Sequence, residues 1–426
     1  MRLRWIIVAI VIALLREGLP NLAAACDWKN RRAACSQARE KKGDSGEICT
    51  NGGGWEKYGP VFWPGDSTSW DSRVDCFVVA KLGGQYVMYF SAPKPTWAIG
   101  RAVSEDGINW KKDEQPVFEP DLTGWDDNVV KCPDIMLDDG TYKLWYQGGG
   151  SGGAGIGYAI SRDGIQWTRY GDGPVLAASQ PWEVDGITTP TVVRLDTVYM
   201  MWYASTQGEG PPTYYKNAQV GLATSADGVQ WTKYESNPVL SFGASGEWDD
   251  DGPFRPRVVY YDGIFHLWYT GLKKGVGRDL KVGHAISKDG VKWLKSPHNP
   301  DLDQGPEGTF DSDNIWCTSI VFEDETTRIW YAALGSDGIE DERFGYGWRP
   351  THQGVKGDVN LDIDINVVDV VLTVNIILGI HQPGQDELWR ADFSSDGEVD
   401  VLDVLGIVGE ILGGGTQKTL NSEVLE

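Results

Sequence analysis

Histidine is scarce in this sequence, with five among 426 residues. No Ser-His-Asp arrangement can be placed on it, so a nucleophilic triad or a zinc site has little support. Basic residues are outnumbered, because 38 Lys and Arg stand against 61 Asp and Glu, which gives a formal net charge of −23. Such a chain repels phosphate backbones and anionic lipids, and nucleic acid is therefore not an expected partner.

Apolar runs long enough to cross a bilayer are missing, since a span takes about 20 residues. Residues 5–15 form a shorter run that follows two arginines and precedes three alanines and Cys26. This is the pattern of a secretory signal peptide. We predict that residues 1–25 are this peptide, that residues 26–50 form a flexible segment, and that the mature protein is secreted without a membrane span.

Cysteine is uncommon, with six residues. Export would place them in an oxidising compartment, where disulfides are possible. We expect a pair between Cys35 and Cys49, and the sequence alone does not assign the other four.

Glycine and aromatic residues are plentiful, with 54 Gly and 20 Trp. This composition suits short strands, tight turns and exposed stacking surfaces, and it favours an all-β fold. The chain is also long enough for more than one domain. Its excess of carboxylates suits calcium or the hydroxyl groups of neutral sugars.

A repeat of the form SxDGxxW runs through the middle of the chain. Its aspartates lie 57, 64 and 62 residues apart, which leaves room for four short strands in each unit, as in one blade of a β-propeller. The four copies have Asp106, Asp163, Asp227 and Asp289 at this position.

A second repeat, of the form YxxWY, is rich in the aromatic and β-branched residues that strands favour. It occurs five times, so residues 51–350 are predicted to form a five-bladed β-propeller. The fifth blade lacks its last strand, and residues 55–62 match the last strand of the other blades. We therefore predict that the two ends of this region close the ring together. The copies begin at Tyr86, Tyr142, Tyr199, Phe265 and Thr327.

Acidic residues within the repeats are interpreted as architecture. The Asp-Gly pairs of SxDGxxW favour tight turns whose residues need positive φ. An aromatic-acid pair also recurs in every blade, and a catalytic group should instead break the repeat. These pairs are Trp70-Asp71, Trp125-Asp126, Trp182-Glu183, Trp248-Asp249 and Phe310-Asp311.

Carboxylates that break the repeat are the catalytic candidates. Asp75 and Asp134 align with the innermost strands, which line the central channel, and Asp185 and Asp251 lie on the loops before them. Glycoside hydrolysis needs one carboxyl to protonate the leaving oxygen and another to act as nucleophile or base. We expect Asp75 to be the base, Asp185 or Asp251 the acid, and Asp134 a tuning partner. The alternative is that these groups are solvated or cap the local backbone.

Aromatic and arginine side chains near the channel are candidates for substrate binding. Trp97 and Trp316 could stack on sugar rings, or could pack between blades. Arg255 and Arg257 could hold a carboxylate or sugar hydroxyls, or could pair with acidic residues 249–251.

Over about residues 51–350, the two repeats resemble the five-bladed glycoside hydrolase superfamily that includes families 43, 62, 32 and 68. The resemblance implies activity on an arabinose-, xylose- or fructose-containing glycan, with aspartates on blades 1 and 2 and a glutamate on blade 3. The sequence departs from this pattern. Lys131 stands where the fructan-cleaving members have the glutamate of a Glu-Cys-Pro-Asp motif, no Arg-Asp-Pro triplet occurs, and blade 3 has Thr188-Thr189. A non-catalytic, carbohydrate-binding propeller is therefore the alternative hypothesis.

Two loops of EF-hand type lie 34 residues apart near the C-terminus, each before an apolar segment, at 370–378 and 404–412. Oxygen-bearing side chains stand at positions 1, 3, 5 and 12 of each loop, which predicts Ca²⁺ binding followed by a helix. An acidic tail without metal is the alternative. The expected ligands are Asp358, Asn360, Asp362 and Asp369 in the first loop, and Asp392, Ser394, Asp396 and Asp403 in the second.

This duplication, over residues 355–413, closely resembles type I dockerin domains. The resemblance implies a cohesin-bearing scaffold or surface protein as partner, chosen in part by positions 10 and 11 of each loop. One departure weakens the first loop, because Ile363 stands where the sharp turn favours glycine. The partner-binding positions are Val367, Val368, Val401 and Leu402.

Overall fold

A computed structural model describes residues 54–413 except 94, 152, 207–215, 276–278, 324, 340, 353 and 363. The predicted signal peptide, the segment 26–50 and the Cys35–Cys49 pair lie outside these residues. No helix in the described part of the chain is both long and apolar enough to cross a membrane.

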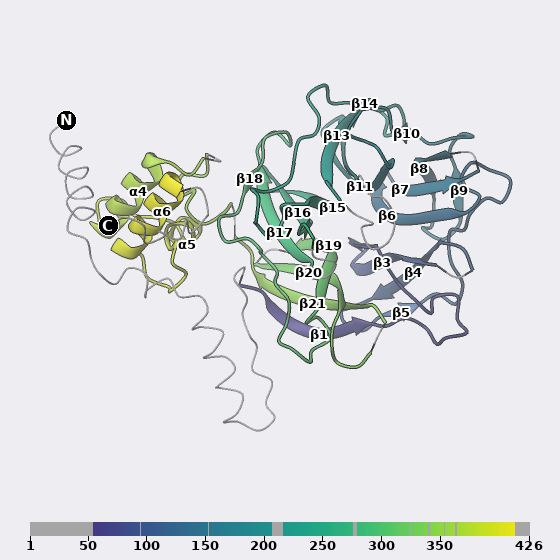
Figure 1. Ribbon diagram of the computed structural model, residues 1–426, viewed down its shortest axis with the longest axis horizontal. Helices are drawn as coiled ribbons and strands as arrows, with labels where there is room; N and C mark the ends of the chain where they lie inside the picture. The colour runs from purple at the N-terminus through teal and green to yellow at the C-terminus, as the bar shows by residue number, and fades with distance from the viewer. Residues whose placement is uncertain are drawn as a thin grey trace, which may run out of the picture. The chain divides into compact units, whose positions relative to one another are not determined.

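Five antiparallel sheets form the five blades, which confirms the predicted all-β propeller (Figure 1). Blade 1 contains β2 (Phe77–Leu82), β3 (Gln85–Ala92), β4 (Ala98–Ser104) and β5 (Lys111–Lys112); blade 2 contains β6 (Val129–Asp138), β7 (Thr141–Gly150), β8 (Gly153–Ser161), β9 (Trp167–Arg169) and β10 (Leu176–Ala177). Blade 3 contains β11 (Ile187–Leu195), β12 (Val198–Ser205), β13 (Gln219–Ser225) and β14 (Thr232–Lys233); blade 4 contains β15 (Gly252–Tyr261), β16 (Ile264–Leu272), β17 (Lys281–Ser287) and β18 (Leu294–Lys295).

The fifth blade is built from both ends of the propeller, as predicted. It contains β19 (Asn314–Glu323), β20 (Thr326–Leu334), β21 (Arg343–Pro350) and, as its outer strand, β1 (Glu56–Phe62). In the register of this pair, Glu56 lies opposite Trp348 and Phe62 opposite Phe344. The open edge of β21 is thus paired, which removes a row of unsatisfied backbone groups.

The recurring aromatic-acid pairs are structural, as interpreted from the sequence. In blade 3, buried Glu183 accepts a hydrogen bond from the Tyr203 hydroxyl at 2.8 Å and forms an ion pair with Lys233. The same acid, tyrosine and cation occur in three more blades, and blade 1 has the acid and the cation. These sets are Asp71 with Lys112, Asp126 with Tyr146 and Arg169, Asp249 with Tyr269 and Lys295, and Asp311 with Tyr331 and Lys57.

The SxDGxxW turns join neighbouring blades. In blade 1, Asp106 accepts backbone hydrogen bonds that close the turn, and Gly107 adopts a φ of +78°, which favours glycine. The Gly107 carbonyl then accepts a hydrogen bond at 2.7 Å from the indole N–H of Trp330 in blade 5. Blade 5 has no such turn, and Trp268 of blade 4 instead donates to Asp301, which Trp55 also contacts.

Three helices, α4 (Val367–Ile377), α5 (Gln385–Ala391) and α6 (Val401–Gly413), form the C-terminal module around buried apolar side chains. The two predicted helices begin three residues earlier than expected, and α5 was not predicted. The earlier start of α4 has a clear cause, because the Asn366 side chain caps it and the Asn366 N–H donates a hydrogen bond to the Asp369 carboxylate.

Candidate active site at the channel mouth

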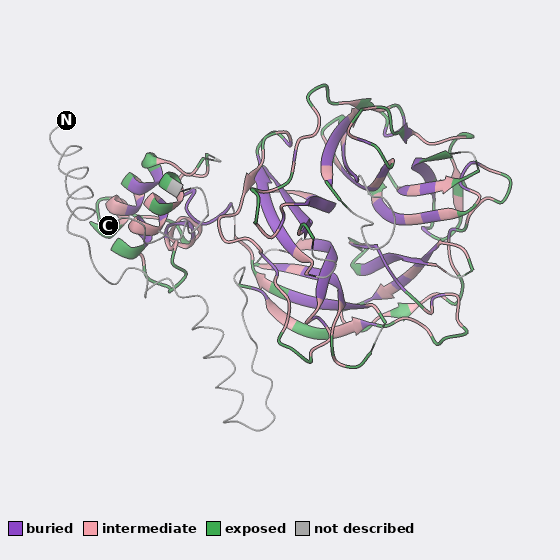
Figure 2. Ribbon diagram, viewed as in Figure 1, coloured by how far each residue is buried: buried purple, intermediate pink, exposed green. Residues whose placement is uncertain are grey.

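The inner strands β2, β6, β11, β15 and β19 all begin at the same end of the channel, which we call the mouth. The loops between the second and third strands of the blades return to this end, because consecutive strands are antiparallel. Purple buried segments surround the channel in Figure 2, so the polar groups at the mouth are held by a packed ring.

Asp75 lies at the mouth, immediately before β2. Its backbone N–H is bound to the Ser91 carbonyl at 2.9 Å, which fixes the carboxylate relative to blade 1. Arg255 donates two hydrogen bonds to it, at 2.6 and 3.2 Å, and the Trp316 indole lies at 3.4 Å. Burial alone would raise the pKa of Asp75, but the charge and hydrogen bonds of Arg255 outweigh it and hold the pKa below its usual value.

Glu342, directly before β21, was missed by the sequence analysis. Burial, followed by the negative charge of nearby Asp75, raises the pKa of Glu342 to about 8. Comparing the residues before the third strands would have found it. Trp97, Ala218 and Leu280 occupy this position in blades 1, 3 and 4, and Glu342 is the one carboxylate among the described residues there.

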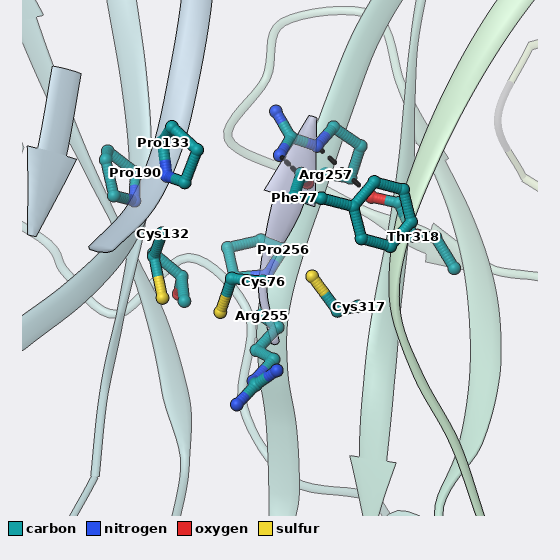
Figure 3. A pocket seen from close by; sticks show the side chains of 11 residues that line it. Cys76, Phe77, Cys132, Pro133, Pro190, Arg255, Pro256, Arg257, Cys317 and Thr318 are labelled. Carbon is teal, nitrogen blue, oxygen red and sulfur yellow. Dashed lines mark hydrogen bonds between the residues drawn. The ribbon is translucent and has the colours of Figure 1, made fainter. Parts of the chain in front are cut away.

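Asp134 lies on β6 and pairs across the channel with Arg257 of β15. Its other oxygen accepts a hydrogen bond from the Val192 N–H at 2.7 Å. Burial raises the pKa of Asp134 despite the charge of Arg257. Arg257 also donates to the carbonyls of Phe77 and Thr318, at 3.3 Å each (Figure 3). Both arginines therefore pair with channel carboxylates, Arg255 with Asp75 and Arg257 with Asp134.

The two other candidate carboxylates lie on the loops that precede the inner strands. Asp185 is exposed, and its N–H is bound to the Thr206 carbonyl at 3.2 Å. Asp251 is buried, and its carboxylate accepts a hydrogen bond from the Asn217 N–H at 3.2 Å.

A hollow of about 390 Å³ opens at the blade 2 side of the mouth. Its lining includes Asn128, Lys131, Gln147 and glycines 148–150, which offer side-chain and backbone hydrogen-bonding groups. The Lys131 ammonium lies 4.7 Å from the centre of the half-buried Trp97 ring, and its charge also lowers the pKa of Asp75. Lys131 therefore both lines this hollow and interacts electrostatically with Asp75.

The C-terminal loops present oxygen donors in the expected order, although no three His, Cys, Asp or Glu side chains converge closely enough to hold a metal anywhere in the described ranges. Asp369 and Asp403, the last donors of the two loops, are fully buried, and burial raises the pKa of Asp369. Backbone N–H groups also bind Asp392 and Asp403 in the second loop. Buried carboxylates of this kind fit a calcium site, because a cation offsets the cost of burying their charge.

Comparison with known families agrees with this architecture. The family described as "Glycosyl hydrolases family 32 N-terminal domain" matches residues 132–255, and "Dockerin type I domain" matches residues 356–412. The chain joins a glycoside-hydrolase-type propeller to a type I dockerin domain. The dockerin module follows the propeller in the sequence and ends with α6. Of the two arginines that bind channel carboxylates, Arg255 is the last residue of the glycosyl hydrolase match and Arg257 lies just beyond it.

Similar proteins cover the propeller. An uncharacterised protein of Mycobacterium tuberculosis, Rv1502, is 26% identical over 68% of this chain and 97% of its own length. The A type blood N-acetyl-alpha-D-galactosamine deacetylase of Flavonifractor plautii is 29% identical over 55% of this chain but only 35% of its own length. A solved structure from the GH130 family of mannoside phosphorylases, which contains glycoside hydrolases that target β-1,2-mannosidic linkages in Candida mannan, is 19% identical, covers 72% of this chain and 96% of its own, and has a TM-score of 0.55.

Proposed function

We propose that the protein is a secreted glycoside hydrolase that cleaves O-glycosyl bonds in a plant or microbial polysaccharide and uses Asp75 and Glu342. The observation that carries this proposal is that the two carboxyl groups lie at the same mouth and their pKa values shift in opposite directions: the pKa of Asp75 is lowered and that of Glu342 is raised. Two carboxyl groups with diverging pKa values are the usual acid and base of such a reaction.

In this mechanism, Glu342 is protonated at neutral pH and donates its proton to the leaving glycosidic oxygen. Asp75 is ionised and acts as nucleophile or as base toward water. Arg255 orients Asp75 and keeps it charged. Asp185 and Asp251 remain candidate acids, but Glu342 is favoured because burial and the charge of Asp75 raise its pKa.

Substrate binding is assigned to the hollow beside Lys131 and to the ring of Trp97, with Trp316 at the base of the mouth. Aromatic faces stack on sugar rings, while backbone and amide groups recognise hydroxyls. Arabinose-, xylose- and fructose-containing glycans are the first substrate class. The similarity to proteins that act on β-1,2-mannosides and on N-acetylgalactosamine adds these two sugars.

The dockerin module is proposed to bind Ca²⁺ through the two loops and to tether the enzyme to a cohesin-bearing scaffold or cell-surface protein. Val367, Val368, Val401 and Leu402 occupy the first turns of α4 and α6, and between 47% and 63% of each is exposed. Apolar side chains so exposed at the starts of two helices suit a protein partner.

A non-catalytic, carbohydrate-binding propeller is the second candidate. It is favoured by the ion pairs that hold both Asp75 and Asp134, because a carboxylate bound by arginine is a weaker base and nucleophile. The hollow and Trp97 would serve this function equally well.

The test is a screen of the full chain for sugar release from arabinan, arabinoxylan, xylan, levan, inulin and β-1,2-mannan, with and without inorganic phosphate. Asp75→Asn and Glu342→Gln should each lower the rate at least 100-fold, whereas Glu307→Gln, at an exposed carboxylate on the loop before β19, should not. Binding of a glycan without release would support the second candidate. Release that needs phosphate would indicate phosphorolysis instead of hydrolysis.

A further inference from the structure

Three cysteine side chains line one small cavity among the inner strands, next to Asp75. Cys76, Cys132 and Cys317 line a cavity of about 10 Å³, enough for roughly one water molecule. Each is buried and free of disulfides. Figure 3 shows Cys76 between Cys132 and Cys317, with the Arg255 side chain next to Cys76.

The backbone is unusual at two of the three cysteines. Cys132 and Cys317 have φ values of +48° and +45°, and a shift of strand register occurs at each. Thr189 and Arg255 occupy the matching positions of blades 3 and 4, with φ of +47° and +52°. Non-glycine residues seldom adopt this conformation, so the inner strands of blades 2 to 5 hold these four residues at a conformational cost.

The order of the blades makes Cys76 the central thiol of the three. Strand β2, which follows Cys76, packs against β6 of blade 2 and β19 of blade 5, which carry Cys132 and Cys317. Cys76 therefore has a thiol neighbour on each side, while Cys132 and Cys317 lie on blades that are not adjacent.

The pKa of Cys76 shifts in the opposite direction from those of Cys132 and Cys317. Burial alone would raise its pKa, but hydrogen bonds from Cys132 and Cys317 and the charge of Arg255 lower the pKa of Cys76 well below its usual value. The pKa of Cys132 is raised well above its usual value by burial and by the interaction with Cys76, and that of Cys317 is raised well above its usual value by the hydrogen bond with Cys76 and by burial. A cysteine of lowered pKa between two other thiols is the arrangement in which one sulfur is oxidised and a neighbour resolves it.

We propose that Cys76 is a redox-reactive cysteine that hydrogen peroxide links to Cys132 or Cys317 as a reversible disulfide. The Cys76 sulfur attacks one peroxide oxygen, the O–O bond breaks, and the departing hydroxide takes a proton to leave as water. The sulfur of Cys132 or Cys317 then attacks the sulfenic acid, the S–O bond breaks, and the thiol proton leaves with hydroxide as a second water. Two thiols are oxidised and one peroxide is reduced.

The disulfide would also change the geometry of the mouth, because Cys76 directly follows Asp75 in the sequence. Movement of Cys76 toward blade 2 or blade 5 would shift Asp75 relative to Arg255. This consequence rests on the proposed function, whereas formation of the disulfide does not.

The test maps disulfides in the full chain. The reduced protein is treated with hydrogen peroxide, denatured, alkylated and digested without reduction, and linked peptides are identified by mass spectrometry. We expect Cys76 linked to Cys132 or Cys317, with the link lost after thiol reduction. Thiols that stay alkylated at all three positions, while cysteines of the N-terminal segment react, would overturn the proposal.

Substitutions test the order of the three. Cys132→Ser should leave only the link from Cys76 to Cys317, and Cys317→Ser only the link to Cys132. Cys76→Ser should reduce linkage among the three to background, and a link between Cys132 and Cys317 in this variant would contradict the central role of Cys76. Thr189→Ser alters the same ring of positions without removing a thiol and should leave the map unchanged. The wild-type map decides the proposal even where a variant fails to fold.

Discussion

Lys57 and Asp311 form an ion pair at 2.8 Å although 254 residues separate them in the sequence. Four other blades hold the same acid and cation between consecutive segments of the chain. In the fifth, the cation comes from β1 and the acid from the loop before β19. The pair therefore ties the N-terminal strand of the propeller to the blade that its C-terminal strands form, where the chain is not continuous.

Lys57→Ala should destabilise the propeller, because it leaves Asp311 buried beside Tyr331 without its cation. Loss of one partner of a buried ion pair costs about 3–5 kcal/mol. We expect a decrease of that size in the free energy of unfolding, measured by urea denaturation. Lys111→Ala removes an exposed lysine and should change stability by about 0.5 kcal/mol or less. Equal stability of the two variants would mean that β1 contributes little to closure.

Ring closure was predictable because it depends on repetition. Trp55, Lys57 and Phe62 match the sequence pattern of the last strand in the other blades, and this match predicts that β1 pairs with β21. The mouth was less predictable. Asp75 was found because it aligns with an inner strand, but its partner Arg255 belongs to a blade that is not adjacent, and no local pattern joins the two.

The role of Glu342 was also not predictable from local sequence. It precedes a strand that was known from the sequence, yet its unusual pKa arises from burial and from the charge of Asp75, which lies 267 positions earlier in the chain. Only the closed ring brings these groups together. The start of α4 was missed for a local reason, since Asp369 was interpreted as a metal ligand alone, whereas it also accepts the hydrogen bond from the Asn366 N–H that completes the cap of α4.

Activity, where a substrate is found, should depend on pH through both carboxyl groups. The acid must be protonated, so the rate should fall as pH rises through about 8, the pKa of Glu342. The base must be ionised, so the acidic limb should lie below the ordinary range of an aspartate, because the pKa of Asp75 is lowered. The pH dependence of kcat/KM measures both limbs. A decline with rising pH that persists in Glu342→Gln would assign the acid to another residue.

Stability should report the pKa of Glu342 without any substrate. Its folded pKa is raised, so the folded state holds the proton more tightly than the unfolded state between about pH 4.5 and 8. The unfolding free energy therefore falls as pH rises through this window, by roughly 5 kcal/mol at most from this group. Glu342→Gln should flatten the decline, measured by urea denaturation at pH 5 and 8.5. Equal slopes in the two proteins would contradict the raised pKa.

The two calcium loops should differ in affinity. In the second loop, position 6 is Gly397, with a φ of +92°. The corresponding residue of the first loop is Ile363, which lies outside the described residues, and a β-branched residue forced into a left-handed turn costs about 1–2 kcal/mol. If the first loop makes the same turn, its affinity for Ca²⁺ is about 5- to 30-fold lower than with glycine.

Ile363→Gly should therefore tighten one of two Ca²⁺ binding events in a calorimetric titration of the full chain and leave the other unchanged. Asp403→Asn should instead weaken the tighter event, because Asp403 is the last donor of the second loop and is fully buried. An unchanged first event in Ile363→Gly would mean that this loop binds without the left-handed turn. Loss of both events in Asp403→Asn would mean that the loops bind as one unit, with α4 and α6 packing only when both are filled.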